Sequence, residues 1–94
     1  MTQDRGRRFI VRGTVQGVGF RWFVLDAAKL LGLSGWVSNR ADGTVTGEVM
    51  GHTAAIEAFM TALERGPRMA HVASIEASEF DSDGDLHVGF EIRE

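Results

Sequence analysis

The residues at positions 16–21 are the first candidates for chemistry in this sequence. They lie between an alternating apolar pattern and a helical one, so they predict a turn that leads into a helix, with Arg21 in its first turn. Glycines let successive backbone N–H groups point toward one centre, and a helix N-terminus adds partial positive charge, so that the two together can bind an anion of phosphate size. Arginine is unfavourable at such a helix start unless an anion offsets both charges. The candidate backbone donors are those of Gln16, Gly17, Val18, Gly19 and Phe20.

This pattern alone does not identify a ligand. The stretch matches neither G-x-x-x-x-G-K-[ST] nor G-x-G-x-x-G, so nucleotide binding of those two types is not indicated. A glycine-rich connection followed by a surface arginine explains the residues about as well as an anion site does. The surrounding elements and any second motif therefore have to decide between the two.

The period of the apolar residues predicts five strands. Alternation from Leu86 to Ile92 is the cleanest example. Asp42-Gly43 supplies the positive φ angles of a hairpin turn between the second and the third strand. The expected strands are 8–15, 35–39, 44–50, 72–80 and 86–92.

Two amphipathic helices are predicted between these strands. The first begins at Phe20 and ends before Gly32, and the second has Thr53 as its N-cap and ends at Gly66-Pro67. Both apolar stripes are expected to pack on the sheet. The stripe of the first helix is Phe20, Phe23, Val24, Ala27, Leu30 and Leu31, and that of the second is Ile56, Phe59, Met60 and Leu63.

The element order β-α-β-β-α-β with one extra C-terminal strand predicts a ferredoxin-like α/β (α+β) sandwich. In this architecture we expect an antiparallel sheet with two helices on one face. A single domain is expected over residues 1–94, with residues 1–6 as a flexible N-terminal tail. Enzymes, RNA-binding modules and metabolite sensors all use this fold, so the site has to identify the function.

The composition excludes several classes of function. The 94 residues include no cysteine, which removes disulfides, thiolate metal sites and a cysteine nucleophile. The N-terminal residues do not read as a secretory signal, and no apolar run is long enough to span a bilayer, so we expect a cytoplasmic protein with no membrane partner. Residues 1–40 carry a net charge of +5 and residues 41–94 one of −8. The basic half could attract a small anion, whereas the total of −3 disfavours nucleic-acid binding.

Two separated motifs resemble those of the acylphosphatase family. The first is V-Q-G-V-G-F-R at 15–21, preceded by the strand R-F-I-V-R-G-T, and the second is G-W-V-S-N-R-A-D-G-T-V-T-G-E-V-M-G at 35–51. G-F-E-I-R at 89–93 continues the resemblance, which covers nearly all of the chain after the first six residues. The family's fold is the sandwich predicted above. His52 and Arg68 stand where a proline is common in the family, and both lie away from the first motif.

The resemblance implies a hydrolase that cleaves the carboxyl-phosphate bond of an acyl phosphate to a carboxylate and inorganic phosphate, with no metal and no cofactor. It implies that Arg21 and the backbone N–H groups of residues 16–20 bind the phosphoryl group and that Asn39 orients the attacking water. An amide cannot act as a base at neutral pH, so a phosphoryl oxygen of the substrate is expected to take the proton. The expected partner is a small acyl phosphate, with phosphate as product and competitive ligand, and the protein is expected to act as a monomer.

Other interpretations stand beside this one. A non-catalytic module could keep the anion site without turnover. A domain acting on carbamoyl phosphate, as in hydrogenase-maturation carbamoyltransferases, is disfavoured by the short chain and the lack of zinc-finger cysteines. RNA binding is disfavoured because the aromatic residues after Gly19 follow a helical stripe.

Two more groups of residues and one tryptophan could also take part in binding. The run 81–85 lacks the glycine and glutamate spacing of a calcium loop, and the three histidines lack metal-ligand spacing. Trp22 is predicted to be a surface or edge-packing residue, with contact to an aromatic acyl group as the alternative.

Overall fold

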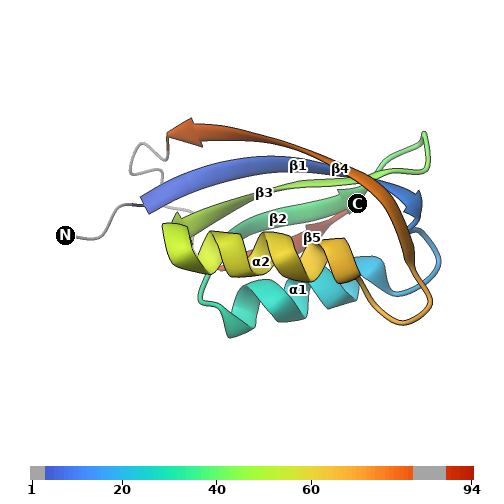
Figure 1. Cartoon of the computed structure of the whole chain (residues 1–94), viewed down its shortest axis with the longest axis horizontal. Coiled ribbons are helices and arrows are strands. Elements are labelled where there is room, and N and C mark those ends of the chain that lie inside the picture. Colours follow the sequence, from blue (N-terminus) through green and yellow to red (C-terminus); the bar gives the residue numbers. More distant parts are fainter. Residues whose placement is uncertain (1–3, 82–88) are drawn as a thin grey trace.

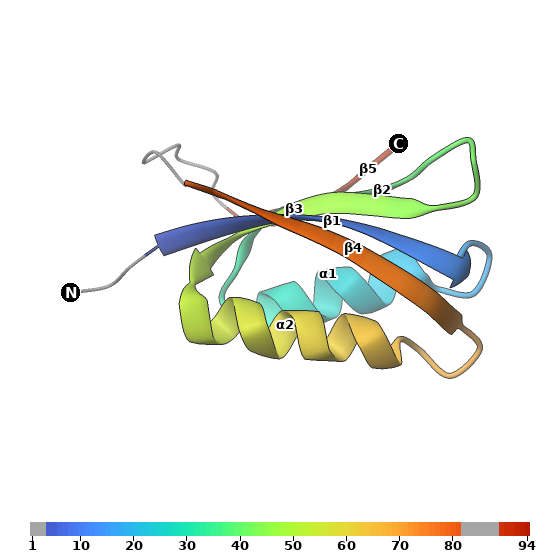
Figure 2. The same cartoon turned by 45° about the horizontal axis from the view of Figure 1, so that its top comes forward.

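The computed structural model describes residues 4–81 and 89–94. Within them, five strands form one sheet, and two helices lie side by side on the same face of that sheet (Figure 1, Figure 2). Neither helix of this described part is long and apolar enough to cross a membrane. In chain order the elements are β1 (Asp4–Thr14), α1 (Phe20–Leu30), β2 (Ser34–Asn39), β3 (Val45–His52), α2 (Thr53–Arg65), β4 (His71–Asp81) and β5 (Phe90–Arg93).

The sheet has the strand order β4-β1-β3-β2-β5. β1 pairs antiparallel with β3 and β4, and β2 pairs antiparallel with β3, so the predicted ferredoxin-like sandwich is confirmed. The extra strand is the exception to an antiparallel sheet, because β5 runs parallel to β2. β5 begins at the end of the sheet where β4 stops (Figure 1), so β5 runs antiparallel to β4. Since β2 also runs antiparallel to β4, β5 and β2 have the same direction.

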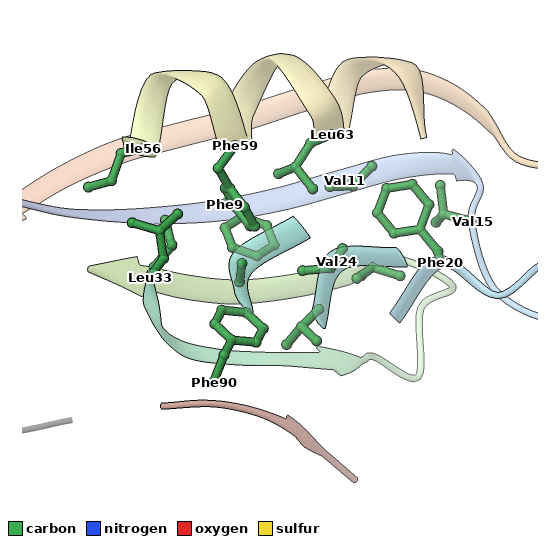
Figure 3. Close-up of a cluster of buried hydrophobic side chains, with 14 residues drawn as sticks. Phe9, Val11, Val15, Phe20, Val24, Leu33, Ile56, Phe59, Leu63 and Phe90 are labelled. Carbon is green, nitrogen blue, oxygen red and sulfur yellow. The ribbon is translucent and has the colours of Figure 1, made fainter. Parts of the chain in front are cut away.

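The core lies between the sheet and the two helices (Figure 3). Alternate residues of each strand point into it, so Phe9 and Val11 of β1 are buried. Arg8, which precedes them, lies on the opposite, helix-free face and is exposed. The Phe59 ring of α2 packs against two strands: its centroid lies 5.6 Å from that of Phe9 and 6.3 Å from that of Phe90. Burial of these apolar side chains is the main favourable term that holds the helices on the sheet.

The apolar face of α1 is rotated relative to the predicted stripe. Phe20, Val24 and Ala28 are buried, whereas Leu30, expected in the stripe, is 88% exposed. Every fourth residue of a helix lies on nearly the same line, and here that line faces the sheet and leaves Leu30 turned toward solvent. The other predicted members, Phe23, Ala27 and Leu31, are partly buried.

β1 begins earlier than predicted. Residues 4–6, expected within a flexible tail, are part of the strand and pair with the end of β3. Gly6 permits close packing over this part of β1, because a Cβ there would lie 2.4 Å from the Phe80 ring. Residues 1–3 lie outside the described residues. Of the strand predicted at 86–92, residues 86–88 also lie outside them, and the strand that the structure describes there is β5.

The second helix has the predicted apolar face but a different N-cap. The backbone stays extended through His52, with φ −66° and ψ 139°, so Thr53 is already the first helical residue. The Nδ1 of His52 accepts a hydrogen bond of 3.3 Å from the N–H of Ala54 and thereby caps the helix in place of Thr53. Ile56, Phe59 and Leu63 are buried and Met60 is partly buried, as predicted.

Shortening the central aromatic side chain should lower stability strongly. Phe59→Ala removes a fully buried ring that packs against Phe9 and Phe90. We expect the free energy of unfolding, measured by urea titration, to fall by about 3–5 kcal/mol. Leu30→Ala, at an exposed position of α1, is the control and should change it by less than about 0.5 kcal/mol. A loss for Phe59→Ala no larger than that of the control would contradict this packing.

Candidate active site

The connection between β1 and α1 ends in a helix start that leaves backbone donors free. Gly17 and Gly19 have φ angles of 75° and 79°, in the left-handed region, and Gly19 is the N-cap of α1. A Cβ at either position would meet no atom within 4 Å, so glycine is needed there for the backbone turn and not for lack of space. The Gly19 carbonyl accepts the N–H of Phe23 at 3.0 Å. The N–H groups of residues 20–22 are therefore left without an intrahelical acceptor.

A cavity of about 110 Å³ lies at this helix start. Since a water molecule takes up roughly 30 Å³ in the liquid, the cavity has room for a compact group the size of a phosphate. It brings together Arg21 of α1 and Asn39 at the end of β2, which are well separated in the sequence. The lining residues are Val15, Gly17, Gly19, Phe20, Arg21, Trp22 and Asn39.

Most of the predicted site residues line this cavity, and two do not. Val18 packs against the core, and the side chain of Gln16 bonds to the β2–β3 connection. The Phe20 side chain is buried, so only its backbone can face a ligand. The predicted residues that line the cavity are Gly17, Gly19, Phe20, Arg21 and Asn39.

Asn39 carries an unused hydrogen-bond acceptor. Its backbone is held by pairing with Val45 of β3, and its carbonyl accepts a hydrogen bond of 3.2 Å from the Ser38 hydroxyl. Its side-chain Oδ1 is buried and has no hydrogen-bond partner among the described residues. A buried polar atom without a partner is costly and uncommon, so this one indicates that a ligand or a water molecule bonds there.

Arg21 is half-buried at the cavity and forms no ion pair within residues 4–81 and 89–94. Several arginines of the sheet, by contrast, pair with glutamates, as Arg8 does with Glu48 at 2.7 Å. No acidic side chain stands in the first turn of α1 to offset the charge of Arg21 or of the helix N-terminus. Two positive features without an acidic partner make this end of α1 the natural place for an anion.

The Gln16 side chain ties the β1–α1 connection to the β2–β3 hairpin. Its Nε2 donates hydrogen bonds to the carbonyl oxygens of Arg40 at 2.7 Å and of Thr44 at 3.0 Å. The Arg40 N–H also donates a hydrogen bond of 2.8 Å to the Thr44 carbonyl. Gln16 therefore bonds to the two residues that close the turn of the hairpin. Because the hairpin begins directly after Asn39, Gln16 links the two walls of the cavity. The sequence predicts only a backbone role for Gln16, because no pattern in it connects this residue with the hairpin.

Asp42 organises the same hairpin. Its carboxylate accepts hydrogen bonds from the hydroxyl of Thr44 at 2.7 Å and from the N–H of Thr44 at 3.0 Å. These two bonds, the one from the hydroxyl first, hold the pKa of Asp42 below its ordinary value of 3.8. The sequence predicts Asp42 as a turn residue but not as the acceptor that holds the buried Thr44.

The other candidates from the sequence do not join the cavity. His52 caps α2, and His71 is exposed at the start of β4. His87 and most of the acidic run at 81–85 lie outside the described residues. In the part of the chain that the structure describes, no group of three or more His, Asp and Glu side chains could hold a metal ion. Trp22 is exposed and does line the cavity.

Comparison with known proteins gives a consistent result. Residues 7–92 match the family model described as Acylphosphatase. A protein named acylphosphatase from Koribacter versatilis is 48% identical over 80 residues, which cover 85% of this chain and 73% of the relative. Another from Anaeromyxobacter dehalogenans is 45% identical over 91 residues, which cover 96% of this chain and 97% of the relative. The crystal structure of acylphosphatase from Bacillus subtilis matches with a TM-score of 0.92 and 39% identity, covering 96% of this chain and 99% of the other.

The hydrogen bonds of Asp42 should appear in the pH dependence of stability. A carboxyl group whose pKa is lowered by folding stabilises the protein above its ordinary pKa, and this contribution is lost as the pH falls through the lowered value. We therefore expect Asp42→Ala to be less stable than the unchanged protein at neutral pH, and the difference to shrink below about pH 4 in urea titrations. Asp42→Asn, which keeps an acceptor but does not titrate, is the control: its difference from Asp42→Ala should not vary with pH. A constant difference between the unchanged protein and Asp42→Ala would contradict the role of the carboxylate.

Proposed function

This chain belongs to the acylphosphatase family and is an enzyme that hydrolyses acyl phosphates, and we propose that the cavity at the start of α1 is its active site. The observation that carries the proposal is the buried Oδ1 of Asn39, which has no partner among the described residues and shares the cavity with Arg21. A buried acceptor suits a water molecule, and an arginine without an acidic partner suits an anion. Together in one cavity, they suit hydrolysis at a phosphoryl group.

The proposed phosphoryl site consists of Arg21 and the backbone donors of residues 16–20. These N–H groups and the N-terminus of α1 direct partial positive charge at the phosphoryl oxygens. The guanidinium of Arg21 binds two of the oxygens with its planar fork. In the transition state the negative charge spreads over the three equatorial oxygens, where donors that are already in place stabilise it without reorganising.

Asn39 is the proposed residue that orients the attacking water. Its Oδ1 accepts a hydrogen bond from the water and so directs a lone pair of the water oxygen at phosphorus, in line with the leaving group. The bond from the water oxygen to phosphorus forms as the bond from phosphorus to the acyl oxygen breaks, and the electron pair leaves with the carboxylate. A phosphoryl oxygen takes the proton from the water, because an amide cannot act as a base at neutral pH.

The proposed reaction requires no metal and no cofactor. A carboxylate is a good leaving group and needs no strong general acid, so positioning and charge stabilisation can supply most of the rate. All proposed site residues belong to one chain, so a monomer suffices. A cytoplasmic location and the lack of nucleic-acid and membrane partners remain predictions from the sequence.

Substituting either proposed catalytic residue should remove most of the activity and leave the fold intact. We expect Arg21→Lys and Asn39→Ala each to lower kcat by about 100-fold or more, the effect of a lost oxyanion donor. Release of phosphate from benzoyl phosphate and from acetyl phosphate measures this. Arg65→Lys, an exposed position at the end of α2, is the control and should keep full activity. Near-normal turnover in a folded variant of either residue would refute the assigned roles.

Inorganic phosphate should compete with the substrate for the same cavity. We expect phosphate to raise KM without changing kcat, and its binding, measured by calorimetry, to be lost in Arg21→Gln. Asn39→Ala should retain most of the phosphate binding, because Asn39 is proposed to bond the water. If the unchanged protein bound phosphate but hydrolysed no acyl phosphate, carbamoyl phosphate included, a non-catalytic anion-binding module would be the better description.

A further inference from the structure

Trp22 is a large side chain of the proposed active-site cavity that takes no part in the reaction proposed above. It lines the cavity and is 65% exposed. Of the other lining residues, Arg21 and the loop backbone are proposed to bind the phosphoryl group, Asn39 to orient the water, and Val15 is buried in the core. A large aromatic surface that is exposed beside a binding cavity is available for contact with a ligand.

We propose that Trp22 forms the acyl-group subsite and gives the enzyme a preference for aromatic acyl phosphates. This inference rests on the proposed function, because it requires the phosphoryl group to lie at Arg21. The acyl carbon is joined to phosphorus through one oxygen atom, so the acyl group must lie directly beside the phosphoryl site. Consecutive residues of a helix do not face each other, so their places in the first turn of α1 alone would not bring Arg21 and Trp22 together. Both line the same cavity, however, which puts the indole beside the phosphoryl site.

The helical turn that carries Trp22 is held by the aromatic residues before and after it. The Phe20 ring is buried in the core, and its centroid lies 6.1 Å from that of the partly buried Phe23. The burial of Phe20 and its contact with Phe23 hold the first turn of α1 on the protein, while Trp22 is exposed to solvent. A side chain on a rigid element that keeps its aromatic surface exposed is suited to a specificity subsite.

Among the described residues, no cationic side chain lies over the indole ring of Trp22. The other tryptophan, Trp36, has the guanidinium of Arg93 over its ring, 4.9 Å from the centroid. Arg8 lies in the same way over Phe80 at 5.4 Å. Within residues 4–81 and 89–94 no cation lies over the Trp22 ring, so its faces can stack on the ring of a substrate.

Another exposed apolar residue, Met69, offers a test of the assignment. It lies on the connection from α2 to β4 and is 74% exposed. That connection passes close to α1, because a Cβ on Gly66 would lie 3.1 Å from the Phe20 ring. Met69 does not line the cavity, however, and we expect it to have no part in recognising the acyl group.

The test compares an aromatic with a small acyl phosphate. For Trp22→Ala we expect kcat/KM for benzoyl phosphate to fall about tenfold, mainly through KM, the size expected for a lost aromatic pair and its buried area. For acetyl phosphate, kcat/KM should change by less than about twofold, because a methyl group makes little contact with the indole. Trp22→Phe should recover most of the benzoyl phosphate activity. Leu30→Ala, an exposed apolar residue at the other end of α1, and Met69→Ala are the controls and should leave both substrates unaffected.

The outcomes separate this inference from the proposed function. Equal losses for both substrates in Trp22→Ala would show that Trp22 only supports Arg21, and a selective loss in Met69→Ala would move the acyl group to the other connection; either result overturns the proposal. If neither substrate were hydrolysed by the unchanged protein, the proposed function would fail. Calorimetric titration with phenylphosphonate and methylphosphonate would then still test the subsite. A preference for the phenyl compound that disappears in Trp22→Ala supports it, and equal affinities in the unchanged protein overturn it.

Discussion

The antiparallel pairing of β1 with β3 is the constraint on which the site depends. In its register Val11 lies opposite Val45, the first residue of β3, so β1 parts from β3 where the β2–β3 hairpin enters the sheet and continues to Thr14 paired with β4 alone. The β1–α1 connection therefore emerges beside that hairpin, and the side chain of Gln16 is long enough to bond to its carbonyl oxygens. A shift of one residue would turn the apolar side chains of β1 away from the helices, so the core and the site depend on the same pairing.

The proposed site is unfavourable in the free protein in two respects. Arg21 stands at a helix N-terminus with no acidic residue in the first turn, and Asn39 buries an acceptor without a partner among the described residues. Each arrangement costs stability, and each is relieved by a ligand of the matching kind, an anion for Arg21 and a donor for Asn39. Rigid surroundings are needed to maintain them, and the hairpin bonds of Gln16 and Asp42 supply that rigidity beside Asn39.

The sequence predicted features that depend on local backbone chemistry. Glycine reaches positive φ angles at little cost, so the turn at Gly17 and Gly19 was visible from residue types alone. Asn39 has no local signal: only the resemblance to a family pointed to it, because strand pairing and not sequence proximity brings it to the cavity. The side-chain bonds of Gln16 were missed for the same reason, since both acceptors are backbone atoms of a distant hairpin.

The predictions about the fold that were wrong failed because of tertiary contacts as well. Threonine is the better N-cap by residue type, yet pairing with β1 keeps the backbone extended as far as His52 and moves the cap by one residue. Leu30 fits the spacing of a helical stripe, but the face of α1 that contacts the sheet contains Phe20 and Val24 and not Leu30. The direction of β5 depends on where β4 ends, whereas the alternation of apolar residues predicts a strand but not its direction in the sheet.

The pairing of β1 with β4 has a consequence for how the molecule folds. The pairs run from Thr14 with His71 to Arg5 with Asp81, so the interior strand gains its second neighbour only by closing loops longer than half of the chain. Closing such long loops costs chain entropy before the contacts between the strands can stabilise the structure. Proteins rich in distant contacts therefore fold slowly for their size. Every proposed site residue lies in the first half of the chain, yet the sheet that supports them is complete only after the second half has docked.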